Sequence, residues 1–201
     1  MLNRKLFPIR HLPLLTLLAA TLMLSGCASV VIGGAATVGV AAFQERGVEG
    51  AARDLKLESG IMERWVRVDH EMVAKLSIEV YEGRALLTGI TDSPKMAAEA
   101  VQLAWKVAGV KDVLNEIQVI SSGSGIVDLA RDSWITTQLK TKLTFDEDVM
   151  AINYAIETVN GTVYLIGIGQ NQAEVDRATA YARSIGYVRK VISHVRVKGT
   201  K

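Results

Sequence analysis

Hydrophobic and polar positions follow the same order twice along this chain. Residues 54–120, shifted by 78 positions, align with residues 132–198 without a gap. The aligned identities include Asp54 with Asp132, Met72 with Met150, Gly83 with Gly161, Gly89 with Gly167 and Val119 with Val197. Because glycines and apolar residues recur together at one spacing, the pattern indicates two copies of one structural unit.

A β-hairpin is the clearest element of each copy. In the second copy, the β-rich runs 152–159 and 162–168 are joined by Asn160-Gly161. Asn-Gly favours a two-residue turn because both residues tolerate positive φ. Glu82-Gly83 is the weaker counterpart in the first copy.

A helix precedes each hairpin, and a second helix and a final strand follow it. Ser93-Pro94 and Asn171 are typical of helix N-termini. The final strands are expected near 113–119 and 191–197. A strand–helix–strand connection is right-handed and parallel. The sequence therefore predicts an α+β fold in which each copy has a small mixed three-stranded sheet with helices on one face.

The amino-terminal segment has the layout of a secretory signal. Basic residues precede an apolar run, 12–24, that is too short to span a membrane. The run ends in Leu24-Ser25-Gly26-Cys27, which resembles a bacterial lipobox and holds the only cysteine. The resemblance implies cleavage before Cys27 and acylation of that residue. By the bacterial sorting rule, Ala28 then implies the outer membrane.

These features divide the chain into five expected segments. They are a signal peptide at 1–26, the acylated Cys27 with a Gly/Ala-rich tether at 27–53, a first unit at 54–120, a linker at 121–125 and a second unit at 126–199.

The two units resemble the BON domain. The similarity is carried by the hairpin segments 160–167 and 82–89, and a lipobox before two such units resembles the DolP family of lipoproteins, most specifically at 132–137. The resemblance implies a non-enzymatic lipoprotein on the periplasmic face of the outer membrane. It also implies that the second domain contacts anionic phospholipid of the inner leaflet, with a role in envelope integrity and concentration at the division site.

Charge and side-chain chemistry point away from an enzyme and from nucleic acid. Removing the signal takes three basic residues and no acid from a formal charge of +2, which leaves −1. This charge does not favour nucleic-acid binding. His70 and His194 have no partner at metal-ligand spacing, and Asp146-Glu147-Asp148 is typical of a solvated loop. We therefore expect no cofactor, metal or small-molecule substrate.

One helix face is the candidate functional surface. Ile135, Leu139 and Leu143 recur at helical spacing and should face the sheet, so Trp134 should project beside them. An aromatic edge bordered by cations suits a lipid headgroup layer. The residues expected to contact phospholipid are Trp134, Arg131, Gln138, Thr141, Lys142 and Phe145.

Two alternatives remain at this stage. Trp134 could instead pack against the other copy. The protein could also be a lipid-anchored protein–protein adaptor for outer-membrane assembly or peptidoglycan remodelling. The charge distribution favours lipid, because residues 126–201 carry 10 basic and 8 acidic side chains, whereas residues 54–120 carry 8 and 11.

Overall fold

The computed structural model describes residues 41–120 and 128–200. The expected signal peptide, the lipidation site Cys27 and the 121–125 linker lie outside the described residues. Within the described residues, no helix is long and apolar enough to cross a membrane.

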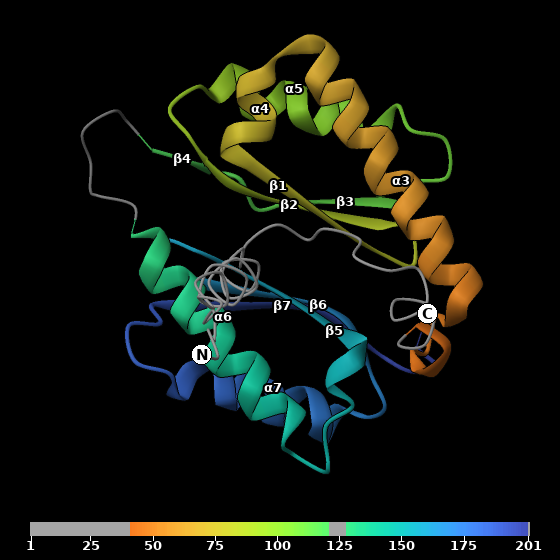
Figure 1. The fold of residues 1–201 in the computed structure, drawn as a ribbon, viewed down its shortest axis with the longest axis vertical. Helices are drawn as coiled ribbons and strands as arrows, with labels where there is room; N and C mark the ends of the chain where they lie inside the picture. Colours follow the sequence, from red (N-terminus) through yellow and green to blue (C-terminus); the bar gives the residue numbers. More distant parts are fainter. Residues whose placement is uncertain (1–40, 121–127, 201) are drawn as a thin grey trace, which may run out of the picture. The chain divides into compact units, whose positions relative to one another are not determined.

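The first copy consists of three helices and a four-stranded sheet. Its elements are α3 (Gly47–Val68), α4 (His70–Lys75), β1 (Leu76–Tyr81), β2 (Arg84–Thr91), α5 (Pro94–Trp105), β3 (Asp112–Asn115) and β4 (Gln118–Val119). Strand β2 pairs antiparallel with β1 and parallel with both β3 and β4. The helices lie on one side of the sheet (Figure 1).

The second copy repeats this plan with three strands. Its elements are α6 (Leu129–Thr144), the 3₁₀ turn η2 (Ala151–Asn153), β5 (Tyr154–Val159), β6 (Thr162–Gly169), α7 (Gln172–Ser184) and β7 (Lys190–Val197). The sheet order is β5-β6-β7, antiparallel and then parallel, with α6 and α7 on one side (Figure 1). The predicted α+β class and the mixed sheets are confirmed.

The hairpin turns and helix N-caps lie at the residues where the sequence predicted them. Asn160 and Gly161 adopt φ of 50° and 71°, and Glu82 and Gly83 adopt 52° and 80°. Each helix after the hairpin is capped, since Ser93 accepts a hydrogen bond from the Met96 amide and Asn171 accepts one from the Glu174 amide.

Two features differ from the expected layout. The first copy carries an additional short helix, α4, whose Asp69 cap accepts a hydrogen bond from the Glu71 amide. Its final strand is divided into β3 and β4, because the Asn115 side chain accepts a hydrogen bond from the Ile117 amide and interrupts the ladder.

Each copy has an apolar core between its helices and its sheet. In the first copy the core includes Ile61, Trp65 and Met72, and the buried Trp65 indole donates to the Ala100 carbonyl over 3.1 Å. In the second copy it is centred on Ile135, Leu139, Leu143, Val163 and Leu165, which are almost completely inaccessible.

A third apolar cluster joins the faces of the two sheets that their helices leave open. It contains Tyr81, Leu86, Val159, Tyr164, Ile166 and Ile168. Polar contacts surround it: Gln118 donates to the Val159 carbonyl, and His194 lies 2.8 Å from Glu116. The two copies therefore bury both faces of each sheet, which lets β-strands carry nearly continuous apolar runs.

Two equivalent glutamates also take part in this interface. Glu79 shares its strand face with Tyr81, and Glu157 occupies the matching position in β5. Burial raises the pKa of Glu79 to about 7, and Glu58 and Glu157 add to the rise while Arg46 and Lys140 oppose it. Burial also raises the pKa of Glu157.

The segment just before α3 contacts both copies. Gln44 donates to the Ile152 carbonyl and the Glu45 amide donates to the side chain of the buried Asn153. Arg46 turns the other way and donates to Asp54 and to the Val80 carbonyl, each over 2.9 Å. We call residues 44–46 the clasp.

Candidate functional site

A buried aspartate fixes the candidate helix to the hairpin. Asp132, in the first turn of α6, accepts hydrogen bonds from the Asn160 amide at 2.6 Å and the Gly161 amide at 2.8 Å. These donors belong to the β5–β6 turn, where both residues have positive φ and cannot use the strand ladder. The first turn of α6 is therefore held at a defined position against the sheet.

Helix α6 exposes the face that the sequence predicted to be exposed. Ile135, Leu139 and Leu143 are completely buried, whereas Trp134 is 45% exposed and Phe145 is 83% exposed. The amphipathic stripe thus turns the indole away from the core, as expected at about 100° per residue.

Trp134 belongs to a small aromatic–cation cluster within the second copy. Its ring meets that of Tyr187 edge to face, with centroids 6.1 Å apart and planes at 73°. The Arg131 guanidinium lies 5.0 Å from the Tyr187 ring centroid and also pairs with Asp128 at 2.9 Å. We call Arg131, Trp134 and Tyr187 the aromatic edge. Its partners all lie in the second copy, so the ring contact of Trp134 is made within that copy.

The other predicted residues lie along the same helix with different surroundings. Phe145 caps the C-terminal end of α6, and the exposed Thr141 donates its hydroxyl to the Thr137 carbonyl. The Lys142 ammonium lies 5.6 Å above the ring of Tyr181. Gln138 is only partly exposed, between the core stripe and the outer face.

Tyr187 is the member of the aromatic edge that sequence reasoning missed. It lies in the loop between α7 and β7, is 67% exposed and has a φ of 68°, an uncommon conformation for a residue with a side chain. The repeat contained a signal, since Tyr187 aligns with Gly109, which has a φ of 103°. Only the second copy places an aromatic ring at this strained position.

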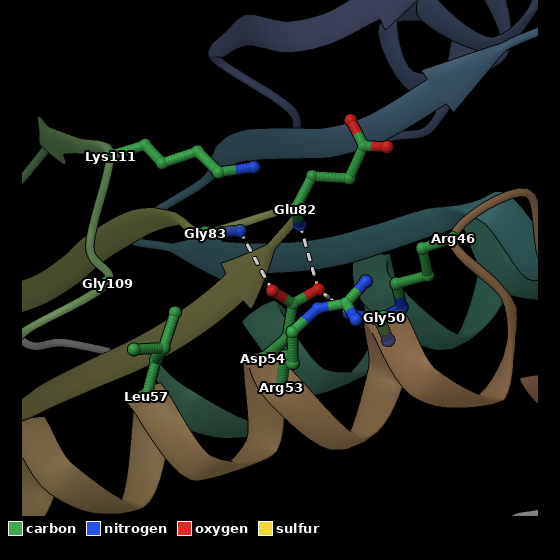
Figure 2. A pocket seen from close by; sticks show the side chains of 9 residues that line it. All are labelled: Arg46, Gly50, Arg53, Asp54, Leu57, Glu82, Gly83, Gly109 and Lys111. Carbon is green, nitrogen blue, oxygen red and sulfur yellow. Dashed lines mark hydrogen bonds and ion pairs between the residues drawn. The ribbon is translucent and has the colours of Figure 1, made fainter.

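The first copy has a different surface at the equivalent place. Asp54 accepts hydrogen bonds from the Glu82 and Gly83 amides, as Asp132 does in its own copy, and Figure 2 shows these bonds. Lys56 stands where the second copy has Trp134. Above the turn, Lys111 and Gly109 border an open pocket in place of an aromatic ring (Figure 2).

The carboxylates of the acidic loop after α6 interact with side chains of α7. The Tyr181 hydroxyl donates to Asp146 over 2.5 Å and lowers the pKa of that carboxyl, and Arg177 lies close to both Asp146 and Asp148. Across residues 41–120 and 128–200, no group of three or more His, Cys, Asp or Glu residues is placed to hold a metal ion.

Known proteins resemble this chain along about two thirds of its length or nearly all of it. The BON domain profile matches residues 54–121 and 131–199. The outer membrane lipoprotein DolP of Haemophilus influenzae is 34% identical over 189 residues, 93% of this chain and 95% of that protein. An uncharacterised protein of Anaplasma centrale is 38% identical over 132 residues, 66% of this chain and 87% of that protein.

A third relative matches about two thirds of this chain. The osmotically inducible protein Y of Escherichia coli is 32% identical over 134 residues, 65% of this chain and 67% of that protein. The architecture and these matches define a protein with tandem BON domains. Within that class, the chain belongs to the DolP family, and it is an envelope-associated BON-domain protein.

Proposed function

We propose that this chain is a non-enzymatic lipoprotein, anchored by acylated Cys27 on the periplasmic face of the outer membrane. Its second copy binds anionic phospholipid of the inner leaflet through the aromatic edge and the outward face of α6. In this role it supports the integrity of the envelope, including at the division site.

The exposed aromatic edge is the observation that carries this proposal. An exposed indole beside a phenol ring and a guanidinium has an apolar body and a polar rim, which suits the headgroup layer of a bilayer. The exposed Phe145 extends the apolar surface to the other end of α6. The strained Tyr187 supports a functional reading, because strain of this kind concentrates at binding sites.

Charge supports the same surface. Arg131 and Lys142 flank the outward face of α6, and each cation near an anionic membrane contributes about 1 kcal/mol. Arg131 is already paired with Asp128. Lys142 should therefore contribute more of the electrostatic attraction, and Trp134 more of the apolar insertion.

The substitution Trp134→Glu should reduce the affinity for phosphatidylglycerol vesicles at least about tenfold, because it removes the inserting ring and adds a charge of the same sign as the lipid. Co-sedimentation of a form that begins at Ala41 would measure this without the anchor. Lys56→Glu, at the matching position of the first copy, is the control and should leave binding unchanged.

A different result of this experiment would favour the adaptor alternative. If Trp134→Glu keeps its circular dichroism spectrum and still sediments with the vesicles, the aromatic edge does not bind phospholipid. The adaptor function, with the anchor serving only for location, would then be favoured.

Anchoring is tested separately at Cys27. The substitution Cys27→Ala should abolish incorporation of a radiolabelled fatty acid and release the protein from the outer-membrane fraction, since Cys27 is the expected site of cleavage and acylation. Ser29→Ala, two residues further on, should keep both properties. Labelling that persists in Cys27→Ala would refute the lipobox assignment.

A further inference from the structure

A pocket in the first copy lies where the second copy carries Tyr187. It has a volume of about 130 Å³ and lies between α3, the β1–β2 turn and the loop before β3. Residues that matter for its chemistry are Arg46, Arg53, Asp54, Gly83, Gly109 and Lys111. Figure 2 shows that these residues come from all three elements.

The carboxylates at this pocket are already compensated. Asp54, which is buried, accepts hydrogen bonds from the Glu82 and Gly83 amides and forms a 2.9 Å ion pair with Arg46. The Glu82 carboxylate lies 3.4 Å from Arg196 of the second copy. Both acids therefore already face a cation other than Arg53 and Lys111.

Two cations at the rim remain available. Arg53 lies 3.7 Å from Glu49, but both side chains are largely exposed, and such a pair contributes little. Lys111 forms no ion pair within residues 41–120 and 128–200. Its aliphatic carbons lie 3.2 Å from the position of a Cβ at Gly83, so the chain extends over the turn.

The second copy has a cation at both aligned positions, but each of them contacts residues of its own copy. Arg131, which aligns with Arg53, is held by Asp128 and the ring of Tyr187. Arg189, which aligns with Lys111, donates to the Asn160 side chain over 3.2 Å. In the first copy this pair of cations borders an open pocket, and Gly109 provides no side chain to cover it.

We propose that this pocket of the first copy binds a phosphate group through Arg53 and Lys111. The guanidinium presents two parallel N–H donors to two phosphate oxygens, and the ammonium adds a mobile point charge from the opposite element. The open backbone at Gly109 leaves room for the group to approach the turn.

The same chemistry has two sources, free phosphate and a phospholipid headgroup. The first copy has a net charge of −3, so its overall field does not attract anions, and binding must come from the local pair of cations. The site shares no residue with the aromatic edge. Its test therefore leaves Trp134 unchanged, and its failure is separate from a failure of the lipid contact of the second copy.

The test uses the full chain in maltoside micelles, which contain no phosphate. Inorganic phosphate and glycerol 3-phosphate are titrated separately at low salt, and the amide resonances of Gly83 and Gly109 are followed by NMR. We expect saturable shifts with a Kd in the millimolar range, weakening as salt is added. Phosphatidylglycerol is then added to the micelles as a third probe.

Two variants and one control assign the binding. The double variant Arg53→Gln/Lys111→Gln should lose affinity at least about tenfold, as expected for the loss of charge-assisted bonds. Gly109→Tyr should also block binding, because it introduces the residue of the second copy. The control Lys95→Gln/Lys106→Gln removes two exposed charges from the same copy and should bind normally.

The outcomes separate the sources and can overturn the proposal. Saturation by inorganic phosphate supports a site for free phosphate, whereas shifts at Gly83 and Gly109 only with glycerol 3-phosphate and phosphatidylglycerol support a headgroup site. Shifts that do not saturate with any probe would overturn it. So would an equal loss in the control, which would show general charge screening.

Discussion

Replacing Gly167 with Ala should lower the free energy of unfolding by more than about 3 kcal/mol, among the largest effects of any single methyl group in this chain. Gly167 has a φ of 150°, and a Cβ there would lie 1.9 Å from the Asn153 carbonyl oxygen and 3.0 Å from its carbon. Both contacts are with the backbone of Asn153, the last residue of η2 just before β5, so no rotamer change relieves them. The strands β5 and β6 would have to separate.

Gly186→Ala is the matched control for this prediction. A Cβ at Gly186 would meet nothing within 4 Å, so its effect should stay within about 0.5 kcal/mol. Urea denaturation followed by tryptophan fluorescence measures both variants. Equal transition midpoints would show that the β5–β6 approach is looser than the structure describes. Gly89, with 2.3 Å to the Lys75 carbonyl oxygen, should behave like Gly167.

The second large effect is a dependence of stability on pH that originates at Glu79. Burial raises the pKa of Glu79 from an ordinary value of 4.5 to about 7 in the folded protein. Between these values the folded state keeps a proton that the unfolded chain has released. The contribution of Glu79 to stability is therefore complete below pH 4.5 and is lost as the pH rises through about 7.

Thermal unfolding at a series of pH values tests this sign. We expect the wild-type protein to lose on the order of 2 kcal/mol between pH 5 and pH 8. Glu79→Gln should remove most of that loss and be the more stable protein at pH 8, because its amide needs no proton. Glu147→Gln, at an exposed loop position, should follow the wild-type profile. A Glu79→Gln profile parallel to the wild type would refute the assignment.

Much of each copy could be predicted because its signals are local. The turn at Asn160-Gly161 depends on two adjacent residues that tolerate positive φ, and the structure places both there. The outward orientation of Trp134 could be predicted from the spacing of Ile135 and Leu139 alone. Its membrane role stays a prediction, since the fold fixes only its exposure.

Other features depend on contacts between residues far apart in the sequence. Asp132 was visible as a repeated residue, but its bonds to the turn 28 residues later require the folded hairpin. Tyr187 contacts Trp134 only because Tyr187 adopts a positive φ, which no local sequence pattern predicts. The contact between the two sheets has a signal in the sequence, because β2 and β6 are apolar on both faces and such strands are covered on both sides.

The clasp gives this protein a particular response to mechanical load. Residues 44–46 are the last part of the chain between the expected anchor and α3, and they bond to Asn153 in one copy and to Asp54 in the other. A pull transmitted along the tether would reach this junction before it reached α3. Traction by a moving or curving membrane would thus be resisted first by a few hydrogen bonds that span both copies, and these would yield before the domains themselves were deformed.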